Sequence, residues 1–352
     1  MQTTAAGIDP ARADHVGPAL LRFVAAHLRA PAARFAEPPE PVTYGWDTYI
    51  YTFRLDADGL PPGAPAAWAE PLVLRLYADP GQFPRAETEV AIQRFVVERG
   101  YPAARPLAVI DTPGSPFALP FVVMERLPGE PMLNPVARNP LRAWSSFASF
   151  AALHAGLHRL DPAGWPLPAE GPRVDRLLAT LRDSAVQFNF HELDAQIAWL
   201  DAHKTAVIPE EPSICHSDYH PLNVLVDGAG RFSVVDWGQA TIGDRHSDVA
   251  NTLVELTLVP TTSLSLWQRM FASVARRLAA RRYLACYRSR LPLDPARLRY
   301  WEALCTLGWA LQFSLVIRDG SVAYGLKPET TAYVRPSHVE AFRRRFDRLT
   351  RG

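Results

Sequence analysis

The sequence predicts an α+β protein in which a small β-sheet lobe with one packed helix precedes a larger, mainly helical lobe. Three observations lead to this prediction. The chain has 352 residues, which exceeds one typical core and favours about two domains. Residues 1–130 contain mostly strand-like segments, whereas residues 131–352 carry mainly helical periodicity. A hydrophobic content of 48% with 21% charged residues is ordinary for a globular protein.

The first lobe is predicted from a series of strand-like and helix-like segments. Residues 14–30 repeat Leu, Phe and Val at helical spacing and stop before Pro31. Residues 42–55 alternate aromatic and β-branched residues, which favours a hairpin around Gly45. A Pro- and Gly-rich connection, expected to be exposed, precedes a strand, a helix that ends at Gly100, and two more strands. In order, the connection and these four elements occupy residues 56–70, 71–78, 85–100, 106–111 and 120–130.

The second lobe is predicted mainly from helical periodicity. Residues 142–160 and 175–188 have the apolar spacing of helices, and nearly everything after residue 246 has it as well. Two short strands are expected between these helices, within residues 216–238. The sequence contains no internal repeat, so we expect the two lobes to differ in structure.

Composition excludes several classes of partner. A formal net charge of +1 gives no reason to expect nucleic acid or an anionic membrane. The longest charge-free apolar stretch, residues 303–317, is shorter than the about 20 residues that span a bilayer. The three cysteines are scattered and odd in number, which disfavours structural zinc and a disulfide framework. Without an apolar signal core at the start, we expect a cytoplasmic protein.

The segment HSDYHPLNVLVDGAGRFSVVDWG, residues 216–238, places polar residues among Val and Leu. Three interpretations compete: a metal-dependent hydrolase site, a phosphoryl-transfer site, and a polar loop without chemistry. In the first, His216, Asp218 and His220 would lie on one face of an extended strand and bind zinc. Pro221 would disturb such a strand, and Asn223 and Asp236 would have no role in this site. The hydrolase interpretation is therefore disfavoured.

Phosphoryl transfer gives every polar position a role. The reaction needs one carboxylate beside the attacking hydroxyl, and a second carboxylate with a neutral oxygen donor to hold Mg²⁺. Asp218, Asn223 and Asp236 supply these groups, because a hairpin turning at residues 228–230 would return Asp236 to the level of Asn223. Protein kinases have the same order and spacing in H-R-D-x-x-x-x-N followed by D-F-G. Here the pattern is H-S-D-x-x-x-x-N followed by D-W-G.

The same segment and its continuation, VVDWGQATIGDRHSDVA, closely resemble the aminoglycoside phosphotransferase family. These small-molecule kinases have a bilobal protein-kinase-like fold. Pro221 and the tail GDRHSDVA are family features that protein kinases do not share. The resemblance extends to LHRLDPAGW, FVVMERLPGEPM and residues 72–109, and it covers roughly residues 40–255. It implies the family's fold for this chain, with ATP or GTP and Mg²⁺ as cofactors.

The resemblance implies a role for each residue that matches the family motif. Asp218 would be the catalytic base that orients the substrate hydroxyl. Asn223 and Asp236 would be the magnesium ligands. His216 and Asp248 would brace the catalytic loop.

In the first lobe, the resemblance implies a nucleotide site. Arg75 would be the strand cation that faces phosphate, and Glu89 would be its partner in the helix. Glu89 is preferred to Glu87 because it lies beside the apolar face of that helix. The loop around Gly45 would cover the phosphates. The hinge would offer backbone groups to adenine from Met124, Glu125 and Leu127.

Two departures from the family pattern concern the nucleotide site. Arg75 stands where protein kinases and many relatives have lysine, and the chain's only lysines, Lys204 and Lys327, follow the first lobe. Because arginine can neutralise phosphate through two hydrogen bonds, we expect Arg75 to replace the lysine in catalysis and nucleotide binding. Gly45 is a single glycine where G-x-G-x-x-G is usual, so the phosphate contacts of its loop are not assigned.

Other polar residues have a structural as well as a functional interpretation. His220 could touch phosphate, but a hydrogen bond within its loop is favoured. Asp244 is expected to cap the helix that follows it. Glu255 and Glu302 could face a substrate amine or solvent, and neither is assigned to the substrate.

These observations favour an ATP-dependent phosphotransferase that acts on a hydroxyl of a small molecule, either a metabolite or an antibiotic. The alternative is a catalytically weak, kinase-like nucleotide-binding regulatory protein, supported by Arg75 and by the sparse glycine loop. A protein kinase is disfavoured by the loop with Pro221 and by the absence of an A-P-E segment. The arginine-rich stretch 260–352 disfavours a polycationic acceptor such as an aminoglycoside. The sequence predicts no oligomeric state.

Overall fold

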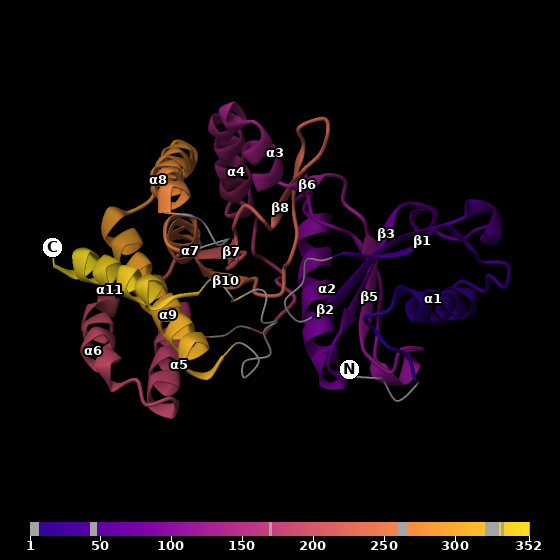
Figure 1. The fold of residues 1–352 in the computed structure, drawn as a ribbon, viewed down its shortest axis with the longest axis horizontal. Coiled ribbons are helices and arrows are strands. Elements are labelled where there is room, and N and C mark those ends of the chain that lie inside the picture. Colours follow the sequence, from indigo (N-terminus) through magenta and orange to yellow (C-terminus); the bar gives the residue numbers. More distant parts are fainter. Residues whose placement is uncertain are drawn as a thin grey trace. The chain divides into compact units, whose positions relative to one another are not determined.

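The computed structural model describes residues 7–42, 48–168, 171–259, 266–320, 331 and 334–351. The chain divides into two compact units, Met1–Pro128 and Gly129–Gly352. Figure 1 shows their secondary structure, with the first unit in indigo to purple and the second in magenta to yellow. No helix within the described residues is both long and apolar enough to cross a membrane.

The first unit is built on a five-stranded antiparallel sheet with the strand order β1-β2-β3-β5-β4. Its strands are β1 (Phe35–Val42), β2 (Thr48–Leu55), β3 (Leu72–Tyr77), β4 (Pro106–Ile110) and β5 (Phe121–Glu125). Strands β2 to β5 were predicted from the sequence, whereas β1 begins at Phe35, before the predicted hairpin at residues 42–55. Gly45, predicted to cover the phosphates from the turn between β1 and β2, lies outside the described residues.

Two helices cover opposite faces of this sheet, α1 (Ala13–His27) and α2 (Phe83–Glu98) (Figure 1). Side chains alternate across a strand, so Leu74 of β3 packs in the core that contains α1, whereas Tyr77 packs in the core that contains α2. Arg75, two positions before Tyr77, is thereby placed on the α2 face. The connection 56–70 is only partly exposed, because Trp68 is buried in the α1 core.

The second unit is mainly helical, as predicted, with short strands between its helices. The helices are α3 (Leu133–Arg138), α4 (Ala143–Leu157), α5 (Arg173–Gln187), α6 (Asp194–His203), α7 (Arg245–Thr257), α8 (Leu266–Arg288), α9 (Pro295–Asp319) and α11 (Pro336–Thr350). Strand β6 (Glu130–Pro131) pairs with β8 (Val224–Val226), which pairs with β9 (Phe232–Val234). Strand β7 (Pro212–Cys215) pairs with β10 (Thr241–Asp244). Helix α7 packs against α8 and α9 and is central to this unit.

Short 3-10 helices occupy several connections of both units. They are Ala57–Gly59, Ala66–Ala69, Pro80–Gln82, Thr112–Gly114, Pro140–Arg142, His191–Leu193 and Lys204–Val207. The sequence did not predict these turns, nor did it predict α3, α6, β6, β7 or β10. All of these elements are short, and their residues show little periodicity of their own.

Gly129 begins the second unit and allows β6 to approach β8. Its φ is +108°, and a Cβ at this position would meet the backbone of Val226 and Asp227. We expect Gly129→Ala to destabilise the protein by about 2–4 kcal/mol, because a left-handed backbone and a backbone clash both oppose a side chain there. Gly230→Ala is the matched control, since Gly230 also has a positive φ, +77°, but no atom within 4 Å of a new Cβ.

Urea unfolding of both variants tests this expectation. The Gly230→Ala protein should lose only about 1 kcal/mol, the contribution of backbone conformation alone. Equal losses for the two variants would show that the approach of Gly129 to Val226 contributes nothing to stability.

Candidate active site

The first unit holds a buried ion pair between Arg75 on β3 and Glu89 on α2. The Nη1 of Arg75 donates to Oε1 of Glu89, and the Tyr77 hydroxyl donates to Oε2 at 2.9 Å. The side chains of Arg75 and Glu89 are only 10% and 2% exposed. Burial, followed by the charge of Glu89, raises the pKa of Tyr77, which stays a hydrogen-bond donor. The predicted partner of Arg75 is thus in place, whereas Glu87 is exposed.

Arg75→Met is expected to destabilise the protein by about 3–5 kcal/mol, because it leaves the Glu89 charge buried without the guanidinium. Arg75→Lys keeps a cation and should cost less. The matched control is Arg34→Met, since Arg34 pairs with Asp56 at 2.8 Å in the same unit but is 55% exposed. That change should cost less than about 1 kcal/mol. Denaturant unfolding of the three variants measures the free energy of unfolding that each loses. Equal losses for Arg75→Met and Arg34→Met would show that the buried ion pair does not stabilise the sheet.

The residues predicted to contact adenine lie at the end of β5 and just after it. Met124 and Glu125 are the last two residues of the strand. The Glu125 amide donates to the Arg105 carbonyl at 3.0 Å and is therefore already engaged. No hydrogen bond within the described residues engages the Leu127 amide, which leaves it able to donate to a ligand.

In the second unit, the β8–β9 hairpin sets the positions of Asn223 and Asp236. Val224 pairs with Val234, and the Val235 amide donates to the Asn223 carbonyl at 3.0 Å. Asn223 precedes β8 and Asp236 follows β9, so both lie at the same end of the hairpin. The turn between the strands is held by Asp227, whose carboxylate accepts from the amides of residues 229 and 231.

Asp218 and Asn223 are joined side chain to side chain. The Asn223 Nδ2 donates to both the carbonyl and the Oδ2 of Asp218, each at 3.0 Å. Burial opposes ionisation of Asp218, but the ion pair with His220, with help from the hydrogen bond that Asn223 donates, keeps its pKa below the usual range. Asp218 is therefore a carboxylate at neutral pH.

The oxygen atoms of this cluster suit a divalent cation. Because Nδ2 of Asn223 faces Asp218, its Oδ1 is turned the other way, and no hydrogen bond among the described residues engages that oxygen. Asp236 is exposed and has a φ of +65°, a conformation that is uncommon for residues other than glycine and that often marks functional sites. Amide and carboxylate oxygens are the ligands that Mg²⁺ prefers. The residues predicted to bind magnesium thus fit that ion chemically.

Asp248 on α7 braces the loop that carries Asp218. It is completely buried, and its two oxygens accept from the amides of His216 at 2.6 Å and Ser217 at 2.8 Å. Ser217 has a φ of +69°, so these bonds hold a residue with an unfavourable backbone conformation immediately before Asp218. Asp248 therefore fixes the backbone of the two residues that precede Asp218.

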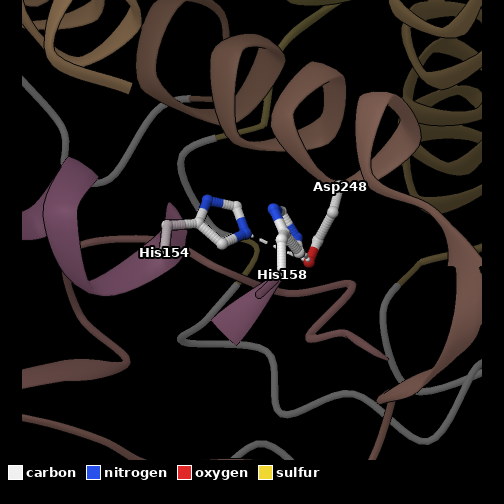
Figure 2. Close-up of side chains that lie close together, drawn as sticks. All are labelled: His154, His158 and Asp248. Carbon is white, nitrogen blue, oxygen red and sulfur yellow. Dashed lines mark hydrogen bonds and ion pairs between the residues drawn. The ribbon is translucent and has the colours of Figure 1, made fainter. Parts of the chain in front are cut away.

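Two histidines complete the surroundings of Asp248 (Figure 2). The Nε2 atoms of His154 and His158 lie 3.1 and 3.2 Å from Asp248 Oδ2. Their Nδ1 atoms face the hydroxyls of Tyr283 at 2.8 Å and Tyr287 at 2.6 Å. The two histidines are one helical turn apart at the end of α4, and the two tyrosines are one turn apart on α8, so the pairs match in register.

The charge of this buried cluster resides on Asp248. Burial alone would raise the pKa of Asp248, but its close contacts with His154 and His158, which lie within hydrogen-bond distance of Oδ2, hold it well below its usual range. Burial, followed by the neighbouring His158, lowers the pKa of His154 to about 4, so His154 is neutral and donates through Nε2. An ionised acid surrounded by donors is well suited to fix the two loop amides.

His216 ties the same loop to the hairpin. Its Nε2 lies 3.1 Å from the Val235 carbonyl, next to Asp236, and its ring packs on Trp237. Burial lowers the pKa of His216, which makes it a neutral donor. His216 is thus engaged with the hairpin, and the metal-binding groups found among the described residues do not join it with Asp218 and His220 as the H-x-D-x-H spacing could have done.

His220 and Asp244 have distinct surroundings. His220 Nε2 lies 3.6 Å from Asp218 Oδ1. Burial opposes protonation of His220, but the ion pair with Asp218 and the other nearby acids raise its pKa to about 9. Asp244 caps α7 as expected, accepting from the His246 amide at 2.9 Å.

Comparison with known proteins identifies the chain. The model of the phosphotransferase enzyme family matches residues 40–301. The chain belongs to this family. No curated protein sequence matches it significantly.

Solved structures give the fold of this phosphotransferase. A putative aminoglycoside phosphotransferase from Ralstonia eutropha superimposes with a TM-score of 0.63 over 95% of both chains, at 16% identity. A thermostable mutant of aminoglycoside phosphotransferase APH(4)-Ia gives 0.59 over 94% of this chain and 98% of that one, at 17% identity. Macrolide 2′-phosphotransferase MphH from Brachybacterium faecium gives 0.53 over 94% and 98%, at 18% identity. The predicted protein-kinase-like α+β fold is confirmed.

Membership of this family shows that the protein is a small-molecule kinase that acts on hydroxyl groups.

The sequence predicted the motif residues of the candidate site, but it did not predict the residues that surround Asp248. His154 and His158 lie in the segment LHAGLHRL, where two histidines spaced one turn apart on an apolar helix were the available signal. Tyr283 and Tyr287 repeat that spacing on α8 and carried no local sign of their partners.

Proposed function

We propose that the enzyme transfers the γ-phosphate of ATP, or of GTP, to a hydroxyl of a small molecule with the help of Mg²⁺. The observation that carries this proposal is the joined pair Asp218–Asn223, held by the Asp248 brace at the end of the hairpin where Asp236 lies. Phosphoryl transfer depends mainly on alignment and charge stabilisation, and a braced loop with oxygen donors provides both.

Each residue has a role in this proposal. Asp218 accepts a hydrogen bond from the acceptor hydroxyl, aligns it, and takes its proton as the new O–P bond forms. Asn223 and Asp236 hold the metal, which offsets charge on the phosphates when bound. His216 and Asp248 keep the Asp218 loop in place. His220 lies next to Asp218 and stays without an assigned catalytic role.

The nucleotide is proposed to be bound by the first unit. Arg75, fixed by Glu89, would offset charge on the phosphates, since arginine binds phosphate well. The free amide of Leu127 would donate to adenine, with the backbone of Met124 and Glu125 beside it. The loop with Gly45 stays a prediction. One similar structure, an APH(4)-Ia mutant at 16% identity, is described as a ternary complex with AMP-PNP and hygromycin B, which supports a nucleotide as phosphate donor.

Binding and turnover together test the proposal. A thermal-shift titration of the wild-type protein with ATP and magnesium should raise the melting temperature in a concentration-dependent manner. A screen of hydroxylated metabolites and antibiotics for ADP release should then find an acceptor. Stabilisation by nucleotide without ADP release for any compound would favour the regulatory alternative. No stabilisation by ATP or GTP would contradict the nucleotide site. A cytoplasmic location stays a prediction.

A further inference from the structure

Glu255 is a buried acid on α7 that the proposed mechanism does not use. It lies two helical turns beyond Asp248 and is 7% exposed. Its Oε1 accepts from the Asn251 side chain at 2.7 Å. Its Oε2 is buried and has no hydrogen-bond partner among the described residues. Because a buried polar atom without a partner costs free energy, this oxygen is a candidate for binding a ligand.

The carboxyl of Glu255 lies beside the residue proposed as the base. One carboxylate oxygen of Glu255, one of Asp218 and one ring nitrogen of His220 all lie within 4.8 Å of one another. Glu255 is therefore within reach of the atoms that neighbour a hydroxyl placed against Asp218.

Asn251 fixes Glu255 relative to the Asp218 loop. Its Nδ2 donates both to Glu255 and to the Ser217 carbonyl, the latter at 3.1 Å. Its Oδ1 accepts from the Trp309 indole on α9 at 3.0 Å. Glu255 thus has a defined position against the residue that precedes Asp218, as a group that selects a ligand must have.

The surroundings of Glu255 favour an uncharged partner. Burial raises its pKa to about 8, with Asp218 and Asp248 acting in the same direction and His220 and Asn251 opposing them. The acid is therefore mostly protonated at neutral pH and can both donate and accept a hydrogen bond. An ammonium group would instead require an ionised carboxylate in a site that disfavours one.

We propose that Glu255 determines acceptor specificity by hydrogen-bonding an uncharged hydroxyl on the carbon next to the reacting hydroxyl. The acceptor class is then a vicinal diol, as in sugars and other polyols. This inference rests on the proposed function, since it places the reacting hydroxyl at Asp218.

The test compares acceptors with variants. Each polyol or sugar that the wild-type enzyme phosphorylates with labelled ATP is paired with its analogue in which the neighbouring hydroxyl is replaced by hydrogen, and with its amino analogue. The wild type should prefer the diol over the deoxy compound by about 10- to 100-fold in kcat/KM, because the deoxy compound leaves a buried group unpaired. It should also prefer the diol over the amino compound.

Two variants of Glu255 separate recognition from folding. Glu255→Gln keeps an uncharged hydrogen-bonding group and should retain the preference for the diol. Glu255→Leu should abolish that preference, so that the ratio of kcat/KM for the diol to kcat/KM for the deoxy compound falls to about 1. A purely structural defect would instead lower kcat/KM equally for both compounds and leave the ratio unchanged. Glu302→Gln is the matched control, because Glu302 is equally buried but pairs with Arg345 on α11; its diol preference should be that of the wild type.

Several results would overturn the inference. A wild-type preference for the amino analogue, or an unchanged preference in Glu255→Leu, would show that Glu255 does not read a neutral neighbouring hydroxyl. Loss of the preference in Glu255→Gln as severe as in Glu255→Leu would show that an ionised carboxylate is needed. Absence of labelled phosphoester from the wild type with every compound would instead contradict the proposed function itself.

Discussion

Asp218→Asn is expected to lower the rate of phosphoryl transfer by about 10²- to 10⁴-fold, the usual contribution of a general base. Asparagine has the shape of aspartate and can still accept the hydrogen bond that Asn223 donates at 3.0 Å. It cannot take a proton from the acceptor hydroxyl. The variant should therefore stay folded and bind ATP with magnesium, yet lose transfer.

A single-turnover experiment with labelled ATP measures this rate without interference from product release. Asp227→Asn is the matched control, since Asp227 belongs to the same hairpin but makes its contacts within the turn, to two amides and to Arg231. We expect its transfer rate to stay within a few-fold of wild type. Circular dichroism and ATP affinity confirm that both variants are folded. Transfer by Asp218→Asn at the wild-type rate would show that Asp218 is not the base.

Asp248→Ala is expected to destabilise the protein by about 3–5 kcal/mol. It removes a buried charge that satisfies the amides of His216 and Ser217 and the Nε2 atoms of His154 and His158. Unpaired buried donors and a broken buried charge network are among the most destabilising changes known. Transfer should fall as well, because Ser217 is no longer held in its left-handed conformation before the base.

Denaturant unfolding of Asp248→Ala should be compared with that of Asp347→Ala. Asp347 is a half-exposed acid of the same unit that pairs with Arg351 one turn away, and its loss should cost at most about 0.5 kcal/mol. If the two variants lost equal stability, the Asp248 cluster would not hold the second unit together.

The core of the candidate site could be predicted because its determinants are local. Asn223 and Asp236 are brought together by one hairpin, whose short strands and Gly-containing turn are visible in the sequence. Asp218 is joined to Asn223 within a single loop. When a site is set by a few neighbouring residues, spacing alone identifies the residues that meet.

The brace around Asp248 could not be predicted in the same way, because its partners are distant in sequence. His154 lies 94 positions from Asp248 and 129 from Tyr283. The three residues belong to three different helices, α4, α7 and α8. Only the packing of those helices brings them together. Glu255 illustrates the same limit: its neighbours suggested either solvent or substrate, and its burial beside Asp218 follows from how α7 packs against the loop.

Small elements and buried connections were missed for related reasons. Strand β10 is four residues long, and it becomes a strand by pairing with β7, which lies before the motif. The connection 56–70 has the composition of an exposed loop, yet Trp68 anchors it in the α1 core. In both cases the structure of the segment depends on contacts with residues distant in sequence, which its local composition does not reveal.

The central claim is that the Asp218 loop and the hairpin form one magnesium-dependent phosphoryl-transfer site. The most direct test is single-turnover transfer of the labelled γ-phosphate of ATP by the wild-type protein across a panel of hydroxylated acceptors, with magnesium or with a chelator. We predict a labelled phosphoester that forms with magnesium and disappears with the chelator. ATP that binds tightly in magnesium, but gives no more phosphoester than Asp218→Asn with any acceptor, would contradict the claim.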